Sequence, residues 1–252
     1  QIECDPKQPL VLNHRVYAFD PSVRAAYLDP HRGFFNGTSL FLAVQGCADQ
    51  AHELVLKPAK GSKNWKAVGA LTALDVNARG FGRYGAANLD ELLDAPFEMG
   101  EFWSGQFQVA GVMHRLVVTG APPCFDGARL LADCQRICTA AIRFWHGPSG
   151  RPPFRSYVFL LHAVEDGYGG LEHRNSTALI CGRHHLPRLG EAGVSDAYLT
   201  LLGLISHEYF HAWNVKRLRP KSFSAYDLHQ ENYTDLLWFF EGFTSYYDDL
   251  LL

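Results

Sequence analysis

The sequence predicts an α+β fold in which a β-rich module precedes a module of mixed helices and strands. Short strand-like runs separated by turn residues fill the chain up to about residue 119. Beyond that point the pattern changes to a long amphipathic helix, two short apolar strands and two further helices. Pro122-Pro123 marks the change. We therefore expect one domain over residues 1–121 and a second over residues 122–252.

The first module is expected to be β-sandwich-like. Its strand-like runs are rich in Val, Leu and aromatic residues, and turns such as Asp20-Pro21, Asp29-Pro30 and Asn36-Gly37 separate them. One short helical turn is expected at Leu89–Leu93. The expected strands are Val11–Phe19, Ser39–Gln45, Glu53–Lys57, Phe107–Val109 and Met113–Thr119.

The second module is expected to begin with a helix that Asp126 can cap and that continues to Trp145, with its apolar residues on one face. Two short apolar strands follow it, and Ser195 can cap the next helix. A last helix is expected from about Thr234 to Leu251. The two strands are Tyr157–His162 and Ser176–Cys181.

Composition argues against several classes of function. The 252 residues carry a formal net charge of −3 without a basic excess, which argues against a nucleic-acid partner. No apolar run is long and uncharged enough to span a bilayer. The six cysteines form no C-x-x-C pair and no regular framework, so we expect six buried thiols. No signal peptide is visible, which leaves the compartment open between cytoplasm and periplasm.

A His-Glu-x-x-His pattern lies inside an apolar run from Leu199 to Trp213, which is typical of a buried helix. Positions i and i+4 share one face of a helix, so His207 and His211 would present two imidazoles side by side, as a tetrahedral zinc ion requires. Glu208 lies about 100° around the helix, where it would border the metal without binding it. This is the place for a general base that acts on water.

Two carboxylates compete for the third ligand position. Glu231 follows His211 by 20 positions in a polar stretch, whereas Glu241 follows it by 30 positions inside an apolar helix. A carboxylate in an apolar helix is costly unless it is paired or bound to metal, which favours Glu241. Asp248 lies on the same helical face as Glu241 and could accept the outer N–H of a ligand histidine.

Longer stretches of the sequence resemble known metallopeptidases. The pattern Trp238-x-x-Glu241-Gly242-x-Thr244-x-Tyr246 resembles the zinc-glutamate helix of the alanyl-aminopeptidase superfamily. More closely, three segments resemble the glycyl aminopeptidase family of gluzincin zinc metallopeptidases. These are HEYFHAWNVKRLRP at 207–220, RGFFNGTSL at 32–40 and GGLEHRNST at 169–177.

The resemblance implies a specific fold and activity. The second module would be a thermolysin-like zincin module, incomplete at its C-terminal end, after a β domain truncated at its start. Members of the family continue into a helical subdomain, often followed by a PDZ-like module, and we expect both in the full-length parent. The resemblance also implies one zinc ion per chain and an aminopeptidase acting on peptides with a free N-terminus, with small first residues such as Gly or Ala preferred.

The segment Gly169-Gly170-Leu171-Glu172 resembles the Gly-x-Met-Glu-Asn strand of the alanyl-aminopeptidase superfamily. The glutamate of that strand holds the α-ammonium of the substrate, so the resemblance implies this role for Glu172. Gly170 is also expected in the substrate-binding site, where it would allow a close approach of the backbone. On the residues alone, a turn with a solvated Glu172 is an equal alternative.

Two other functions stay open at this point. A thermolysin-like endopeptidase would use Glu231 as its third ligand and would cleave N-acetylated peptides. A non-catalytic zinc-binding fragment would bind zinc stoichiometrically without turnover.

Overall fold

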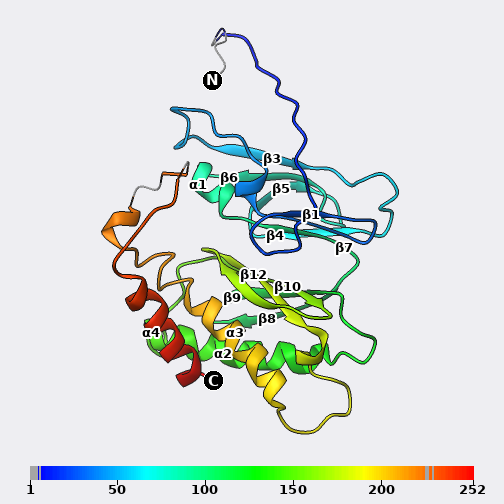
Figure 1. The fold of residues 1–252 in the computed structure, drawn as a ribbon, viewed down its shortest axis with the longest axis vertical. Helices are drawn as coiled ribbons and strands as arrows, with labels where there is room; N and C mark the ends of the chain where they lie inside the picture. Colours follow the sequence, from blue (N-terminus) through cyan, green and yellow to red (C-terminus); the bar gives the residue numbers. More distant parts are fainter. Residues whose placement is uncertain (1–4, 6, 225–226, 229) are drawn as a thin grey trace.

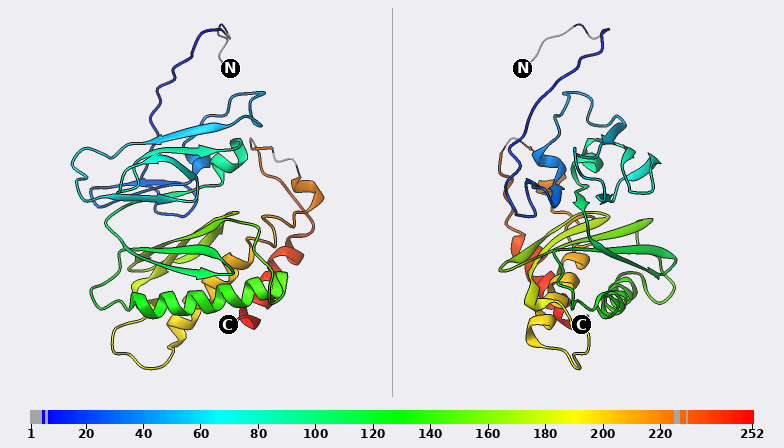
Figure 2. Two further views of the ribbon diagram at one scale, coloured as in Figure 1. Left: turned by 180° about the vertical axis from the view of Figure 1, so that it is seen from behind. Right: turned by 90° about the vertical axis from the view of Figure 1, so that its right-hand side faces the viewer.

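The computed structural model describes residues 5, 7–224, 227–228 and 230–252. Two β layers lie one above the other, and helices lie beneath the second layer (Figures 1 and 2). This arrangement confirms the α+β fold with a β-rich N-terminal domain. No helix in the described part of the chain is long and apolar enough to cross a membrane.

The upper layer comprises the strands before residue 101 and contains two antiparallel sheets. The four-stranded sheet has the order β1 (Ala26–Leu28), β2 (Arg32–Phe35), β7 (Phe97–Gly100), β4 (Lys66–Gly69). The three-stranded sheet has the order β3 (His52–Leu56), β6 (Gly82–Ala86), β5 (Thr72–Val76). The short helices of this layer are η1 (Gly37–Ser39) and α1 (Leu89–Leu93). The expected helical turn is thus confirmed as α1. It lies at the edge of the upper layer that faces loops of the lower layer (Figure 1).

The lower sheet has five strands, of which β10 pairs in parallel with both β9 and β12. Its order is β11 (Tyr168–Glu172), β12 (Ser176–Gly182), β10 (Ser156–Val164), β9 (Val112–Thr119), β8 (Trp103–Val109). The sheet therefore crosses the boundary expected at Pro122, because strands before that residue pair with strands after it. The division between the two layers lies between Gly100 and Trp103 instead.

Three main helices cover the lower sheet and its edge (Figure 1). They are α2 (Gly127–His146), α3 (Asp196–Phe210) and α4 (Leu237–Leu250), with the short turns η2 (Arg183–His185) and η3 (Lys221–Phe223). Both expected caps are present, since Asp126 accepts from the Arg129 N–H and Ser195 from the Tyr198 N–H. The last helix begins at Leu237 rather than near residue 234.

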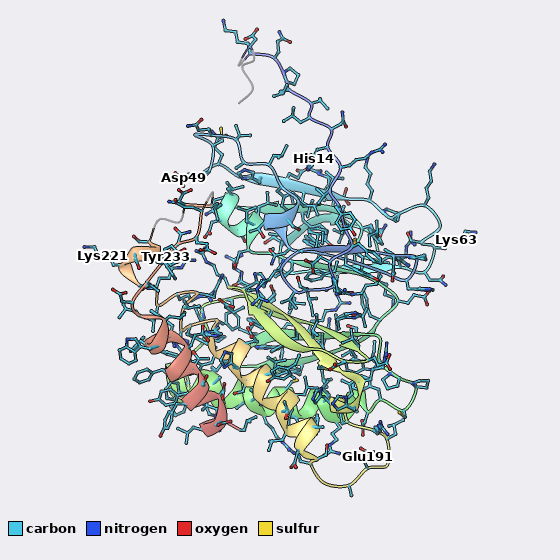
Figure 3. The ribbon with its side chains drawn as sticks, in the orientation of Figure 1. His14, Asp49, Lys63, Glu191, Lys221 and Tyr233 are labelled. Atoms are coloured by element: carbon cyan, nitrogen blue, oxygen red, sulfur yellow. The ribbon has the colours of Figure 1, made fainter. Side chains whose placement is uncertain are left out.

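Strand β10 connects the two layers, because it is buried on both faces. Tyr157, Phe159 and Leu161 pack in the core shared with the helices. Val158 and Leu160 pack with upper-layer residues, and side chains fill the space between the layers (Figure 3). Alternate residues of one strand thus join the helices to the upper layer.

Several expected elements are wrong. Residues 11–18 form no strand and are largely exposed, and Phe19 makes only an isolated bridge to Tyr27. The strand expected at Ser39–Gln45 is absent, since Ser39 ends η1 and residues 40–45 are irregular. The sequence also did not predict β11 or most upper-layer strands. Several of these are short and rich in glycine, such as GRYGA in β6 and YGGLE in β11.

The cysteines also differ from expectation. Cys134, Cys138 and Cys181 are buried thiols as expected. Cys47 is only partly buried and Cys124 is exposed, because both lie in loops rather than in the apolar elements. Cys4 lies outside the described residues.

Candidate metal centre

The end of α3 and the middle of α4 bring together two imidazoles and one carboxylate. The Nε2 atoms of His207 and His211 lie 3.1 Å apart, and Oε2 of Glu241 lies 3.5 Å from each of them. The potential ligand atoms all lie within 4.8 Å of one another. Within the described residues, no other group of three His, Cys, Asp or Glu side chains converges in this way. The structure thus brings together the three side chains that the sequence analysis proposed as metal ligands.

The outer nitrogen of each imidazole has its own acceptor. His207 Nδ1 lies 2.6 Å from Asp248 Oδ2, and His211 Nδ1 lies 2.8 Å from the Asn214 carbonyl oxygen. If each imidazole carries its proton on Nδ1 and donates it to its acceptor, each Nε2 is left with a free lone pair. Two lone pairs and a carboxylate oxygen facing one another repel unless a cation lies between them. The donor set of two imidazoles and one carboxylate fits zinc, with one coordination position left open.

Hydrogen bonds hold α4 against the end of α3. Ser206 Oγ donates to the Asp248 carbonyl oxygen over 3.0 Å. Asn214 Nδ2 donates to the Phe240 carbonyl oxygen and to Thr244 Oγ1, over 3.1 and 3.0 Å. These buried contacts fix the helix that carries Glu241, although no local pattern in the sequence pointed to Asn214.

The surroundings favour positive charge at the centre. Burial disfavours the charged imidazole, but the hydrogen bonds to Asp248 and Glu241 outweigh it and raise the pKa of His207 to about 10. The pKa of His211 also rises despite its burial, because Glu241 and Glu172 are close. Hydrogen bonds from the two imidazoles hold the pKa of Glu241 well below its usual range. A cation, whether a proton or a metal ion, is therefore stabilised here.

Glu241 differs in one respect from the sequence argument. Its side chain is 47% exposed, and its neighbours Trp238 and Phe239 are exposed as well. Glu241 therefore does not lie in the apolar surroundings that the sequence argument assumed. What connects it to the cluster is its distance of 3.5 Å from each imidazole. Glu231 lies in an exposed loop, where its carboxylate accepts from the Tyr233 hydroxyl, and it is not part of the cluster.

Glu208 is buried beside the two imidazoles and lies against β11. Its Oε2 has no hydrogen-bond partner within the described part of the chain. Burial, and next the Glu172 carboxylate, raise the pKa of Glu208 to about 7. A Cβ at Gly170 would lie 2.3 Å from Glu208 Oε1, so only glycine leaves room for this carboxylate. The backbone at Gly170 thus approaches the Glu208 side chain closely.

Glu172 is the last residue of β11 and is partly buried. Alternate residues of a strand share a face, so Glu172 lies on the same side as Gly170, toward α3. Its charge contributes to the raised pKa values of Glu208 and His211, which places it near both. Glu172 therefore lies in a strand beside the centre rather than in a solvated turn.

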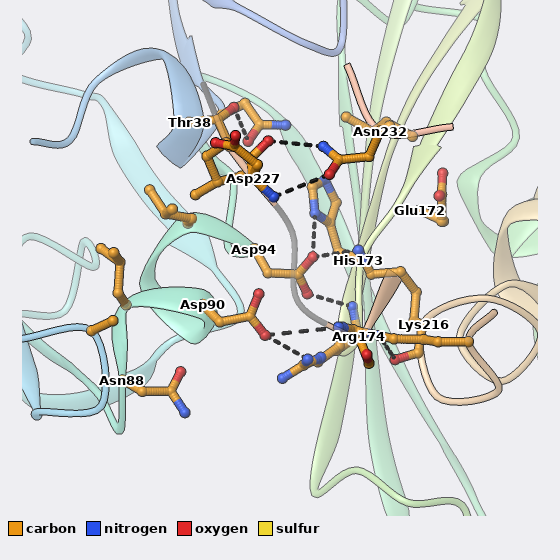
Figure 4. Close-up of a pocket in the computed structure, with 18 of the residues that line it drawn as sticks. Thr38, Asn88, Asp90, Asp94, Glu172, His173, Arg174, Lys216, Asp227 and Asn232 are labelled. Atoms are coloured by element: carbon orange, nitrogen blue, oxygen red, sulfur yellow. Dashed lines mark hydrogen bonds and ion pairs between the residues drawn. The ribbon is translucent and has the colours of Figure 1, made fainter. Parts of the chain in front are cut away.

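A cavity of about 810 Å³ opens beside Glu172, between the upper layer and the loops that follow β11 and α3 (Figure 4). None of the three potential metal ligands lines it. Its wall includes Asp94, His173 and Lys216, none of which was assigned a role from the sequence.

Comparisons with known proteins identify similar families and one similar structure. Residues 200–252 match the family model for M61 glycyl aminopeptidase, and residues 1–101 match that for the peptidase M61 N-terminal domain. The crystal structure of an aminopeptidase N family protein from Idiomarina loihiensis is similar, with a TM-score of 0.89 and 44% sequence identity. The match covers 94% of this chain and 39% of that one, so the chain spans about two fifths of that protein's length. A search of curated proteins gave no match.

Proposed function

Because this chain belongs to the M61 glycyl aminopeptidase family, we propose that it carries the zinc site of an aminopeptidase that removes small N-terminal residues such as Gly or Ala. The observation that supports the proposal best is the convergence of His207, His211 and Glu241 beside Glu208. The matching family and the similar structure also indicate a peptidase.

His207, His211 and Glu241 are the residues that would hold one zinc ion, which when bound would act as a Lewis acid toward the scissile carbonyl and the attacking water. Asp248 and the Asn214 carbonyl would keep both imidazoles oriented through their Nδ1–H groups.

Glu208 would be the general base. Its Oε2 is buried and unpaired in the described structure, so it is free to accept the proton of the attacking water. The same carboxyl group would then pass the proton to the leaving amine. Gly170 leaves the space in which Glu208 stands.

Glu172 would make the enzyme an exopeptidase. Its carboxylate lies on the face of β11 that is turned to α3, where it could bind the α-ammonium of a peptide through charge-assisted hydrogen bonds. This contact would fix the first peptide bond beside Glu208 and the metal ligands.

Metal analysis coupled to an assay on Gly-, Ala- and acetyl-Ala-anilides tests this function in the full-length protein. We expect one zinc ion per chain and hydrolysis of the two free-amine anilides only. Cleavage of the acetylated anilide would favour an endopeptidase. Stoichiometric zinc without turnover would favour a non-catalytic zinc-binding protein.

A further inference from the structure

Neighbouring residues at the end of β11 face opposite sides of the lower sheet. Gly170 and Glu172 face α3, whereas Leu171 packs with the apolar residues that join the lower sheet to the upper layer. His173 follows this alternation and is buried on the upper side, with its Nδ1 3.4 Å from Asp94 Oδ1. One side of this strand end therefore faces the metal centre, and the other is attached to the upper layer.

Asp94 forms a junction between three separate segments (Figure 4). It is the C-cap residue of α1 in the upper layer. Its Oδ2 accepts from the Arg174 backbone N–H over 2.7 Å, in the turn between β11 and β12. Its Oδ1 lies 2.6 Å from Lys216 Nζ, in the loop that follows α3. Charge-assisted bonds of this kind, with a mostly buried carboxylate, are among the stronger polar contacts in proteins.

The turn is also held from its other side. Arg217 Nη1 donates to the Arg174 carbonyl oxygen over 2.8 Å, and its Nη2 donates to Asn175 Oδ1 over 3.0 Å. The β11–β12 turn, which follows Glu172 directly, is thus held by α1 on one side and by the loop after α3 on the other. The second contact from α1, between Asp90 and the Arg174 side chain, is more exposed, since the Asp90 side chain is 47% exposed.

We propose that Asp94 is a positioning residue for the site at which Glu172 binds the α-ammonium of the substrate. Through Asp94, the upper layer holds Glu172 in its place beside the metal centre. Asp94 acts through the backbone of the β11–β12 turn and does not itself touch the substrate. This inference rests on the aminopeptidase function proposed above. A shift of Glu172 by about 1 Å would move the scissile bond away from its reactive position, which commonly costs about 100-fold in rate.

The first test compares Asp94→Asn with Asp90→Asn in the full-length protein. Asp90 lies in α1 and Asp94 is its C-cap, and of the two only Asp94 contacts the backbone of the β11–β12 turn and Lys216. For Asp94→Asn we expect kcat/KM on Ala-anilide to fall by about 10- to 100-fold, mainly through KM, with unchanged zinc content. Asp90→Asn should stay within about twofold of the wild type. Loss of zinc in Asp94→Asn would overturn the proposal, because it would indicate a general structural role.

A double-mutant cycle identifies the residue through which Asp94 acts. If it acts through Glu172, Asp94→Asn should cost less than about twofold when added to Glu172→Ala, since the ammonium contact is already lost. A full additional loss would contradict the proposal. If Asp94→Asn does not fold, Lys216→Gln removes the ion pair from the same carboxylate and should show the same pattern.

Hydrogen exchange tests the link without any assay of activity. Amides in residues 168–176 should exchange faster in Asp94→Asn than in the wild type or in Asp90→Asn. Unchanged exchange in this segment would overturn the proposal. A wild-type protein that cleaves neither free-amine nor acetylated anilide would refute the aminopeptidase function, while the exchange experiment still decides whether Asp94 holds the strand end.

Discussion

Asp248 Oδ2 lies 2.6 Å from His207 Nδ1, although 41 residues separate them in the sequence. The Asp248 side chain is only 12% exposed, and the backbone of the same residue accepts from Ser206. This contact fixes the ring of His207 so that Nε2 faces His211 and Glu241. The orientation of the candidate metal ligands therefore depends on how α4 packs against α3.

Replacing Asp248 tests this dependence. We expect Asp248→Ala to weaken zinc affinity by about 10- to 100-fold, because the His207 ring loses the acceptor that fixes its tautomer and orientation. Competition with a chelator of known affinity measures the change. Asp249→Ala, at the exposed neighbouring position, is the matched control and should bind zinc like the wild type. Equal affinity in the two variants would show that Asp248 does not support the metal site.

The third ligand can be tested with two alanine variants. Glu241→Ala should release zinc, because Glu241 Oε2 is the only carboxylate oxygen in the cluster found among the described residues. Glu231→Ala should retain zinc, since Glu231 lies in an exposed loop outside the cluster. Zinc analysis after dialysis distinguishes them. The reverse result would favour Glu231 as the third ligand, as expected for a thermolysin-like endopeptidase.

Gly170→Ala tests the space beside the proposed base. Its Cβ would lie 2.3 Å from Glu208 Oε1, so the carboxylate or the strand must move. We expect hydrolysis to fall by about 100-fold or more with zinc retained, because a displaced base no longer reaches the attacking water. Gly203→Ala is the control within α3, where the nearest atom would be 3.9 Å from the new Cβ. A fully active Gly170→Ala would mean that Glu208 does not need this position.

The stability of the fold should depend on pH through His114. This imidazole is fully buried, and its Nε2 lies 2.8 Å from the Tyr209 hydroxyl. Burial lowers the pKa of His114 to about 4, below the value of about 6.5 expected in the unfolded chain. The unfolded state therefore binds more protons between these values, and stability falls as the pH drops through them.

This dependence gives a measurable slope. His114 should account for a loss of about 2 kcal/mol in the free energy of unfolding between pH 7.5 and pH 5. Urea unfolding at both values measures it, and His114→Gln should remove this part of the pH dependence. An equal pH dependence in the wild type and in His114→Gln would show that His114 is not buried in its neutral form.

The parts of the structure that sequence analysis predicted well are those that local patterns determine. The caps Asp126 and Ser195, the helices that they begin and the one-turn spacing of His207 and His211 all follow from interactions within a few residues. The strands of the upper layer were mostly missed, because their pairing partners lie far away in the sequence and several strands are short and rich in glycine.

The site shows the same division. Glu241 was favoured for a reason that its 47% exposure does not support, yet the packing of α4 places it beside the imidazoles. Asp94 had no local signal at all, because its partners come from the β11–β12 turn and from the loop after α3. Contacts of this range depend on the assembled fold and cannot be read from residue spacing.

The most direct test of the proposed zinc aminopeptidase is the variant Glu208→Gln, measured for both zinc content and hydrolysis of Ala-anilide in the full-length protein. Glu208 is a buried carboxylate beside the cluster, and its Oε2 has no hydrogen-bond partner within the described residues. We predict unchanged zinc content and a loss of hydrolysis of about 100- to 10,000-fold, as expected for a missing general base. Hydrolysis near the wild-type rate, with zinc still bound, would contradict the account.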